Sequence, residues 1–553
     1  MRNHRQTSLS PIRFILLTDL HLSDNPGTAA HQALDWAIET INQENPDFLA
    51  IAGDMTSFGT RPATACFLTA LERIQVPVCL TPGNAERRSD AGLPLLNDWL
   101  SPANKHFQQG ELSVLLPDTS TGTLPTNERQ WLEEMAIAHL APRRILITHY
   151  PLDVLKPESA AWLEQWLAAH RVELVAAGHR HIHRHRRLGM SAEFVSRGLD
   201  PDKAIGDLPG LSLLQSPRPG EWSERFLPWS PAIELLPADL PRNIHPVGWS
   251  IHGDPIDAVR ETREFGLCCL ELRPRNMDFS RPALSEEITC LRDQAPVYLS
   301  YHLPNLAWDE EQNAFKGEEE VRAGLDVALA AGVDSLTAHV PRARSQSMEN
   351  NGRPTEVYAG FVDLFAKLFS DPLRAGVRLA IENIHNPPQT PVDSPALEFA
   401  TQVDQYLGWI DAVHKAIPNA PAGTIGALFD IGHARNNGGD LDNMQPLSEW
   451  YARVGSRILG YHIHQVGLHP ETGKPANHQT ITQLFGKRIS YAGFLWAWST
   501  RQIARAPLFV EVRQAEGRRE TASRLKSIFD DDHRIDLATD LPDRAMDRIP
   551  QDS

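Results

Sequence analysis

The sequence predicts an α/β protein of two domains, a layered N-terminal α/β domain followed by a C-terminal (β/α)8 TIM barrel. With 553 residues, the chain is too long for one ordinary hydrophobic core. Two regions of alternating strand-like and helix-like segments are separated by a proline-rich stretch over residues 216–245. The second region holds eight apolar runs in about 270 residues, which is the size of a (β/α)8 barrel. We therefore expect domains at 1–215 and 246–525, joined by a linker and followed by an acidic polar tail at 526–553.

Composition and charge exclude several classes of protein. Hydrophobic residues make up 41% of the chain and charged residues 22%, and no stretch approaches eighteen consecutive apolar residues. Membrane-spanning and wholly disordered proteins are therefore excluded. Lysine and arginine number 53 against 70 for aspartate and glutamate, a net charge of −17 that gives no general attraction for nucleic acid. The 23 histidines are many for this length, and histidine is the commonest metal ligand.

The cysteines and the N-terminus point to a cytoplasmic protein. Five cysteines occur with no CxxC spacing, unlike the framework of a secreted disulfide-rich domain. The N-terminal apolar run is short and leads into TDLHL without a small-residue cleavage site, so it is interpreted as a first core strand. We expect a small-molecule partner, phosphorylated or sugar-like, and neither nucleic acid nor a membrane.

The first region contains apolar runs that each end in a polar residue, as buried strands of a layered α/β domain do. These runs cover residues 12–19, 47–54, 76–84, 143–150 and 172–179, and a helical pattern covers 29–43. Seven residues of the kinds that bind metals follow the strand ends in order: Asp19, His21, Asp54, Asn84, His149, His179 and His181. Because the ends of parallel strands share one edge of a sheet, these side chains can converge on one crevice. Such a set can hold two cations that polarise a phosphoryl oxygen and activate water.

These residues resemble the signature of the calcineurin-like metallophosphoesterases, which consists of DxH, GD, GN followed by His, a lone His, and GHxH. The resemblance spans roughly residues 12 to 215. It implies two divalent metals, Mn, Fe or Zn, with Asp54 as the bridging ligand. One metal would be bound by Asp19, His21 and His181, and the other by Asn84, His149 and His179. His149 would also take part in catalysis.

The sequence departs from that signature at position 85. The family has a histidine after the asparagine, whereas this chain has Ala85, followed by Glu86. That histidine contacts phosphate and assists the leaving group, and general acid catalysis of this kind contributes about 10²–10⁴-fold. Either the substrate has a leaving group that needs little protonation, or His31 or His106 substitutes, or the domain is weakly active or only binds.

The second region predicts a metal centre at the mouth of a barrel. Its eight runs cover 247–252, 267–272, 297–302, 335–340, 378–383, 426–433, 458–464 and 507–513. The third to eighth runs end in metal-ligand types, namely His302, His339, Glu382, Asp430, His433, His462, His464 and Glu511. Active sites of such barrels lie at these strand ends. Charged groups at the ends of buried strands are costly without partners, and a divalent metal would provide such a partner. The competing interpretation is a layer of ion pairs that closes the mouth of the barrel.

This half is similar to the xylose isomerase-like barrel superfamily, through CLELRP, YHLPNL, IEN, FDIGHA, YHIHQ, NHQTI and FVEV. The resemblance implies one divalent metal, Zn, Mn or Mg, held by Glu382, Asp430, His462 and Glu511. His462 is preferred over His464 because the family's ligand stands three residues before an acidic position, here Gln465. The apurinic endonuclease branch would add His302, His339, His433 and His478 in a multinuclear site, although Ala476 replaces an aspartate of that branch.

Three functions remain open at this stage. The first is hydrolysis of a phosphomonoester or phosphodiester at the N-terminal bimetal site, with the barrel acting on a sugar-like or phosphorylated metabolite. The second is a sugar isomerase or epimerase, in which Glu382 and Glu511 exchange a proton with carbon and the first domain is degenerate. Glu271 favours this branch, although a structural carboxylate fits equally well there. The third is a metal-dependent binding protein without catalysis.

Overall fold

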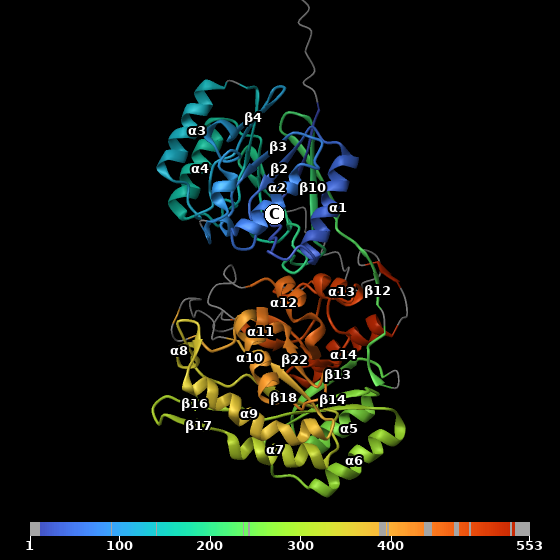
Figure 1. The fold of residues 1–553 in the computed structure, drawn as a ribbon. Coiled ribbons are helices and arrows are strands. Elements are labelled where there is room, and N and C mark those ends of the chain that lie inside the picture. Colours follow the sequence, from blue (N-terminus) through green and yellow to red (C-terminus); the bar gives the residue numbers. More distant parts are fainter. Residues whose placement is uncertain are drawn as a thin grey trace, which may run out of the picture. The chain divides into compact units, whose positions relative to one another are not determined.

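The computed structural model describes residues 11–89, 91–139, 141–235, 237–241, 244–385, 394, 397–435, 445–468, 475–485, 488–530 and 534–536. The chain divides into two compact units, one made mostly of Met1–Pro231 and the other of Ala232–Ile489 with Phe494–Ile535. Figure 1 shows the elements of each unit. The mixed α/β fold and the order of the two domains are as predicted.

The first unit contains two β-sheets. The five-stranded sheet has the order β11-β10-β1-β2-β3. Its strands are β1 (Ile12–Leu17), β2 (Phe48–Ala52), β3 (Val78–Thr81), β10 (Gly210–Arg218) and β11 (Glu221–Pro228). The six-stranded sheet has the order β4-β5-β6-β7-β9-β8. Its strands are β4 (His106–Gln109), β5 (Leu112–Leu115), β6 (Arg143–Ile147), β7 (Leu174–Ala177), β8 (Arg184–Leu188) and β9 (Ser191–Val195).

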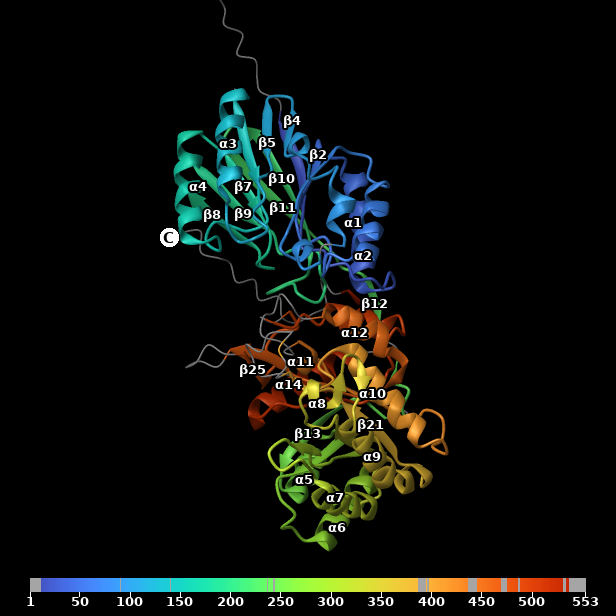
Figure 2. The ribbon, with the colours of Figure 1, turned by 60° about the vertical axis from the view of Figure 1, so that its left-hand side comes forward.

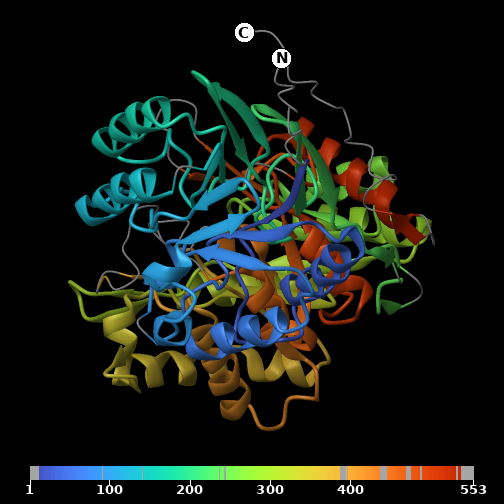
Figure 3. The ribbon, with the colours of Figure 1, turned by 90° about the horizontal axis from the view of Figure 1, so that it is seen from above.

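Helices cover the outer faces of these sheets. They are α1 (Ala29–Glu44), α2 (Arg61–Leu71), α3 (Thr126–Ala138) and α4 (Pro157–Ala169), with short 3-10 turns at Ala85–Arg87, Leu93–Leu96 and Pro102–Asn104. Figure 2 shows α1 and α2 on one side of the strands and α3 and α4 on the other. The same layering is visible from above in Figure 3, where the teal and blue helices flank the strands.

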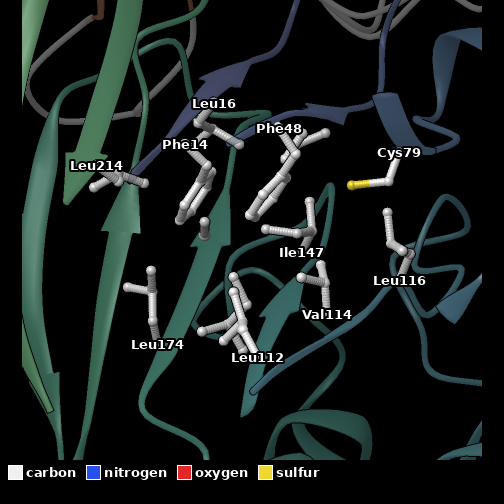
Figure 4. Close-up of a cluster of buried hydrophobic side chains, with 14 of the residues drawn as sticks. Phe14, Leu16, Phe48, Cys79, Leu112, Val114, Leu116, Ile147, Leu174 and Leu214 are labelled. Carbon is white, nitrogen blue, oxygen red and sulfur yellow. The ribbon is translucent and has the colours of Figure 1, made fainter. Parts of the chain in front are cut away.

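The core of this unit draws side chains from both sheets, as Figure 4 shows. Phe14 of β1 stacks on Phe48 of β2 with ring centroids 4.8 Å apart, and Trp222 of β11 meets Phe14 edge-on. Ile147 of β6 and Leu174 of β7 belong to the same cluster. The continuously apolar runs of the sequence thus become strands buried on both faces.

Two expectations about this unit need correction. The ligand-bearing strands do not form one sheet, because β1, β2 and β3 belong to the first sheet and β6 and β7 to the second. The prediction of a linker over 216–245 is wrong for its first part, because residues up to Pro228 form the β10–β11 hairpin. In β11 alternate residues are exposed, and Trp222 and Phe226 are the more buried ones, so the segment behaves as an edge strand despite its flanking prolines.

The second unit is a closed barrel of eight parallel strands, each coinciding with one of the predicted apolar runs. The strands are β13 (Val247–Gly253), β14 (Cys269–Pro274), β15 (Tyr298–His302), β18 (Ser335–His339), β21 (Arg378–Glu382), β22 (Ile425–Asp430), β23 (Ile458–Ile463) and β26 (Leu508–Val510). Short strand pairs outside the barrel are β16 (Ala307–Asp309) with β17 (Ala314–Lys316), β19 (Glu349–Asn350) with β20 (Arg353–Pro354), β24 (Gln465–Leu468) with β25 (Pro475–Gln479), and β12 (Ala232–Glu234) with β27 (Arg534–Asp536).

Helices surround the barrel strands in Figure 1. They are α5 (Pro255–Phe265), α6 (Arg281–Gln294), α7 (Glu318–Ala330), α8 (Ser345–Met348), α9 (Glu356–Arg374), α10 (Val403–Ala416), α11 (Ile431–Arg435), α12 (Leu447–Val454), α13 (Ala492–Ser499) and α14 (Ala515–Phe529), with a 3-10 turn at Gly455–Arg457. Helix α14 runs past the predicted domain end at 525, and most of the predicted tail lies outside the described residues. All five cysteines are free thiols. Among the described helices, none has the length and apolarity needed to cross a bilayer.

Candidate functional site

The seven predicted residues of the first domain come together at the ends of strands from both sheets. They sit in the loops that follow β1, β2, β3, β6 and β7. Asp19, His21, Asp54, His179 and His181 all have positive φ angles, between 48° and 70°. Non-glycine residues rarely adopt this conformation, and such strained positions cluster at functional sites. The backbone therefore directs these side chains inward at some cost in free energy.

Two neighbouring groups of ligand atoms form this site. In the first group, His21 Nε2 lies 3.3 Å from His181 Nε2, and Asp19 Oδ1 lies 3.6 Å from that His181 nitrogen. Asp19 is fully buried, and its Oδ1 has no hydrogen-bond partner among the described residues. Burial raises the pKa of Asp19 to about 7. A buried carboxylate oxygen that faces two imidazole nitrogens fits a divalent cation between them.

In the second group, His149 is oriented by the backbone. Its Nδ1 bonds to the Ala52 carbonyl oxygen at 2.8 Å, so Nδ1 donates and Nε2 carries the free lone pair. That Nε2 lies 3.0 Å from Asn84 Oδ1, and His179 Nδ1 lies 3.0 Å from the same amide oxygen. The hydrogen bond from Nδ1 of His149 to the backbone carbonyl of Ala52 is of the kind that orients metal-binding histidines.

Asp54 lies between the two groups. Its Oδ2 is 3.5 Å from His21 Nε2, and its Oδ1 is 3.4 Å from His149 Nε2. One carboxylate thus faces both groups with different oxygens, which is the placement that a bridging ligand requires. Gly83 is needed beside it, because a Cβ at that position would lie 2.1 Å from Asp54 Oδ1.

The residues at the departure from the family signature have structural contacts. The backbone N–H of Ala85 donates to Asp54 Oδ1 at 2.8 Å, and the Ala85 side chain is fully buried. Glu86 accepts from the backbone N–H groups of Asp54, Thr56 and Gly83 at 2.9 to 3.0 Å. Glu86 therefore fastens the loops after β2 and β3 to each other.

The two histidines considered as substitutes for the missing acid lie elsewhere. His31 of α1 bonds to Thr28 Oγ1 at 2.8 Å, and His106 of β4 bonds to Ser113 Oγ at 3.0 Å. Within the described residues, neither forms a hydrogen bond to the seven. Tyr150 is instead the neighbour that sequence reasoning missed: its ring stacks on His179 with centroids 3.9 Å apart. Its place directly after His149 was the available signal.

In the barrel, His462 of β23 is surrounded by carboxylates from three other strands. Its Nδ1 lies 2.9 Å from Glu511 Oε2, 3.1 Å from Glu382 Oε1 and 3.7 Å from Asp430 Oδ2. Burial opposes the charged imidazole, but the carboxylates, with Glu382 foremost, raise the pKa of His462 well above its ordinary value. One nitrogen facing three carboxylates is a donor set that fits a divalent cation. His464 Nε2 lies 3.1 Å from Asp430 Oδ1.

Glu271 of β14 holds the other side of the His462 ring. His462 Nε2 lies 2.7 Å from Glu271 Oε1, which also accepts from Ser250 Oγ at 2.8 Å. The second oxygen accepts from Thr337 Oγ1 at 2.5 Å and Ser300 Oγ at 3.3 Å. With four donors around it, Glu271 is an ionised acceptor that fixes the orientation of the His462 ring through Nε2. Nδ1, on the other side of the ring, faces the remaining carboxylates.

Glu382 contacts three of the histidines that the endonuclease branch would add, namely His302, His339 and His433. Its Oε2 lies 2.9 Å from His302 Nε2 and 3.3 Å from His339 Nε2, while Oε1 faces His462 and His433. A third possible ligand group comprises Asp430, His433 and His478. Glu382 thus faces several imidazoles with two oxygens, as Asp54 does in the first domain. His385, whose ring lies 4.6 Å from that of His433, was missed, although it follows Glu382 by three residues at a strand end.

Arginines gather at the same end of the barrel. A cavity of about 490 Å³ is lined by His252, Arg273, His478, Glu511 and Arg513 among others. Adjoining cavities are lined by Arg273 with Arg275, and by Arg273 with Arg342. Arg273 also forms an ion pair with Glu511. Arg273 lies in β14 and Arg275 directly after it, whereas Arg342 follows β18 and Arg513 follows β26. Because they are spread along the chain, no basic run in the sequence revealed them.

Comparisons with known proteins agree with this geometry at the level of families. Residues 12–183 match the model of calcineurin-like phosphoesterases, and residues 259–528 match that of the xylose isomerase-like TIM barrel. The chain therefore carries these two domains in the predicted order. The phosphoesterase match supports a hydrolase that uses divalent metals, and the described residues include groups that could hold such ions.

The curated relatives match about a third of this chain or less. A "probable cyclic nucleotide phosphodiesterase" of Moraxella catarrhalis is 24% identical over 198 residues, which cover 32% of this chain and 70% of the relative. The 3′,5′-cyclic adenosine monophosphate phosphodiesterase CpdA of Escherichia coli K12 is 25% identical over 28% of this chain and 59% of its own length. A solved D-tagatose 3-epimerase-like protein covers 51% of this chain and 97% of its own, with 13% identity and a TM-score of 0.34.

Proposed function

We propose that the first domain hydrolyses a small phosphodiester at a bimetal centre. The observation that carries this proposal is the position of Asp54, whose two oxygens face His21 and His149 of different ligand groups. Two divalent cations held there would polarise the phosphoryl oxygen and activate water. The relatives that match this domain are cyclic nucleotide phosphodiesterases, which supports a small phosphodiester substrate over a macromolecular one.

Ala85 limits which phosphodiesters the first domain can hydrolyse, because the leaving group must depart without a proton from this position. It has no proton to donate, and neither His31 nor His106 bonds to the site residues. The domain should therefore hydrolyse esters whose leaving group departs as a stable anion, such as aryl phosphodiesters, far faster than alkyl ones.

The test uses the full chain loaded with Mn²⁺, Zn²⁺ or Fe²⁺ and a bis-aryl phosphodiester. Turnover is expected in wild type and in Glu382→Gln, and it should be lost in Asp54→Asn, which keeps the shape of the side chain but removes its charge. Absence of turnover with all three metals, or full activity in Asp54→Asn, would refute the proposal.

For the barrel, we propose a metal centre that acts on a phosphorylated, sugar-like metabolite. Glu382, Asp430, His462 and Glu511 would hold one divalent metal, with further ions at His302, His339, His433 and His478. The arginines at the strand ends support an anionic substrate, because guanidinium groups bind phosphate by paired hydrogen bonds.

The alternative for the barrel is a sugar isomerase or epimerase. It is favoured by the pair Glu382 and Glu511, which face the same His462 nitrogen at 3.1 and 2.9 Å. Uptake of solvent deuterium at a substrate carbon would support it, together with loss of that exchange in Glu382→Gln and its retention in Asp54→Asn. Loss of activity in Asp54→Asn with Glu382→Gln unaffected would exclude it.

A further inference from the structure

A second set of histidines follows His181 in the chain, with His183 directly before strand β8 and His185 within it. The sequence from His183 to Arg186 alternates histidine and arginine, so the two kinds of side chain point to opposite faces. Arg184 forms ion pairs with Asp153 and Glu193 on one face. His183 and His185 lie on the other face, toward strand β11.

Both histidines contact one carboxylate on that neighbouring strand. His183 Nε2 lies 3.3 Å from Glu224 Oε2, and His185 Nε2 is bonded to the same oxygen. The three ligand atoms all lie within 4.8 Å of one another. The Glu224 side chain is only 3% exposed, whereas those of His183 and His185 are 24% and 47% exposed. A buried carboxylate is thus reached from solvent through two imidazoles.

The direct partners of the buried Glu224 carboxylate are the two imidazoles. In the described part of the chain, no lysine or arginine forms an ion pair with Glu224, although Arg197 interacts with it electrostatically. A buried carboxylate held by two imidazoles is a set of ligand atoms that a divalent cation can share. In a tetrahedral zinc site, bonds of about 2.0–2.1 Å place ligand atoms roughly 3.3 Å apart. The 3.3 Å separation of His183 Nε2 from Glu224 Oε2 matches that spacing, whereas His185 Nε2 is hydrogen-bonded to the same oxygen and would move away from it to bind the ion.

We propose that His183, His185 and Glu224 form a third cation site of the first domain, suited to Zn²⁺, with water completing the coordination. Its position indicates a structural role. β8 is the edge strand of the six-stranded sheet and β11 the edge strand of the five-stranded sheet, so the ion joins the two sheets at their open edges. Hydrogen bonds between strands do not connect these edges, and a metal bridge stabilises the folded state by binding it selectively.

The test compares the zinc content of full-length wild type and His185→Gln after equilibration with excess Zn²⁺ and dialysis. Elemental analysis should find one zinc per chain fewer in His185→Gln. The matched control is His170→Gln, because His170 pairs with the single carboxylate of Glu133 at 3.4 Å and should leave the count unchanged. Glu224→Gln should lose the same single zinc, which guards against an effect peculiar to one variant.

Thermal unfolding provides the second measurement. Added Zn²⁺ should raise the melting temperature of wild type more than that of His185→Gln, because only wild type has the bridge between β8 and β11. Equal zinc content in wild type and both variants would overturn the proposal and leave a plain histidine–glutamate ion pair. Zinc loss in His170→Gln as large as in His185→Gln would overturn it too.

Discussion

Replacing Glu271 by glutamine should weaken metal binding in the barrel without altering its shape. Glu271 is fully buried, and His462 Nε2 lies 2.7 Å from its Oε1. Glutamine can keep an oxygen at this position, and the hydroxyls of Ser300 and Thr337 can rotate to accept from its amide group. The substitution therefore removes a charge and preserves the hydrogen-bond count. For His462, what changes is the strength of its own bond to residue 271, from charge-assisted to neutral.

The magnitude follows from that single change. A hydrogen bond to a charged group contributes about 1.5–3 kcal/mol and a neutral one about 0.5–1.5 kcal/mol, so the loss, taken between the midpoints, is about 1.3 kcal/mol. This corresponds to roughly tenfold weaker metal affinity, the lower end of the effect of losing an outer-shell partner of a metal-binding histidine.

The assay is competition for Zn²⁺ or Mn²⁺ between the protein and a chromophoric chelator. The background is Asp54→Asn, so that the barrel dominates the signal. The control is Thr337→Val, which removes one donor to Glu271 but leaves the bond to His462 intact. An affinity unchanged within twofold in Glu271→Gln, or an equal loss in Thr337→Val, would refute the role of Glu271 in orienting His462.

Three further predictions concern the first domain. Ala85→His should raise kcat for alkyl phosphodiesters by roughly 10²-fold, with little change for aryl ones, because only poor leaving groups need a proton; an equal rise for both would contradict this. Phe14→Ala should destabilise the domain by about 3–5 kcal/mol in urea unfolding, since the buried ring stacks on Phe48; a loss below about 1 kcal/mol would contradict that stacking role. The hydrogen bond from Arg184 lowers the pKa of Asp153 to about 2. The ion pair therefore stabilises the fold fully above the pKa of Asp153 in the unfolded chain, near 4, and this contribution is lost as the pH falls toward 2. Asp153→Asn should thus cost at most about 1 kcal/mol at pH 7 and nothing near pH 2, in unfolding free energies compared at both pH values; a difference that grows on acidification would contradict the sign.

The strands and their order could be predicted from the sequence because each buried strand is a continuous apolar run that ends in polar residues. All eight barrel strands coincide with such runs. The hairpin of β10 and β11 was missed because its flanking prolines resemble a linker; the pairing of β11 with β10 and the packing of Trp222 on Phe14 show that it is a strand. Propensity is local, whereas that contact joins residues 208 positions apart.

The residue types of both candidate sites were likewise readable from the chain, because strand ends bring polar side chains to one place. Their roles were not. Glu271 could be a catalytic or a structural carboxylate by sequence, and its contact with Nε2 of His462 favours a role in orienting that ring. The arginines of the barrel mouth lie in or after three different strands and have no shared motif.

By itself, the sequence determined which residues could serve as ligands and that position 85 has no proton donor. Only the tertiary structure decided how they are divided: Asp54 between two groups, Glu382 among four histidines, and Glu224 with two histidines of another sheet. The physical reason is that cation binding depends on distances of a few ångströms between side chains that are far apart in the chain. Apolar patterning specifies where strands form, but the pairing of sheets sets those distances.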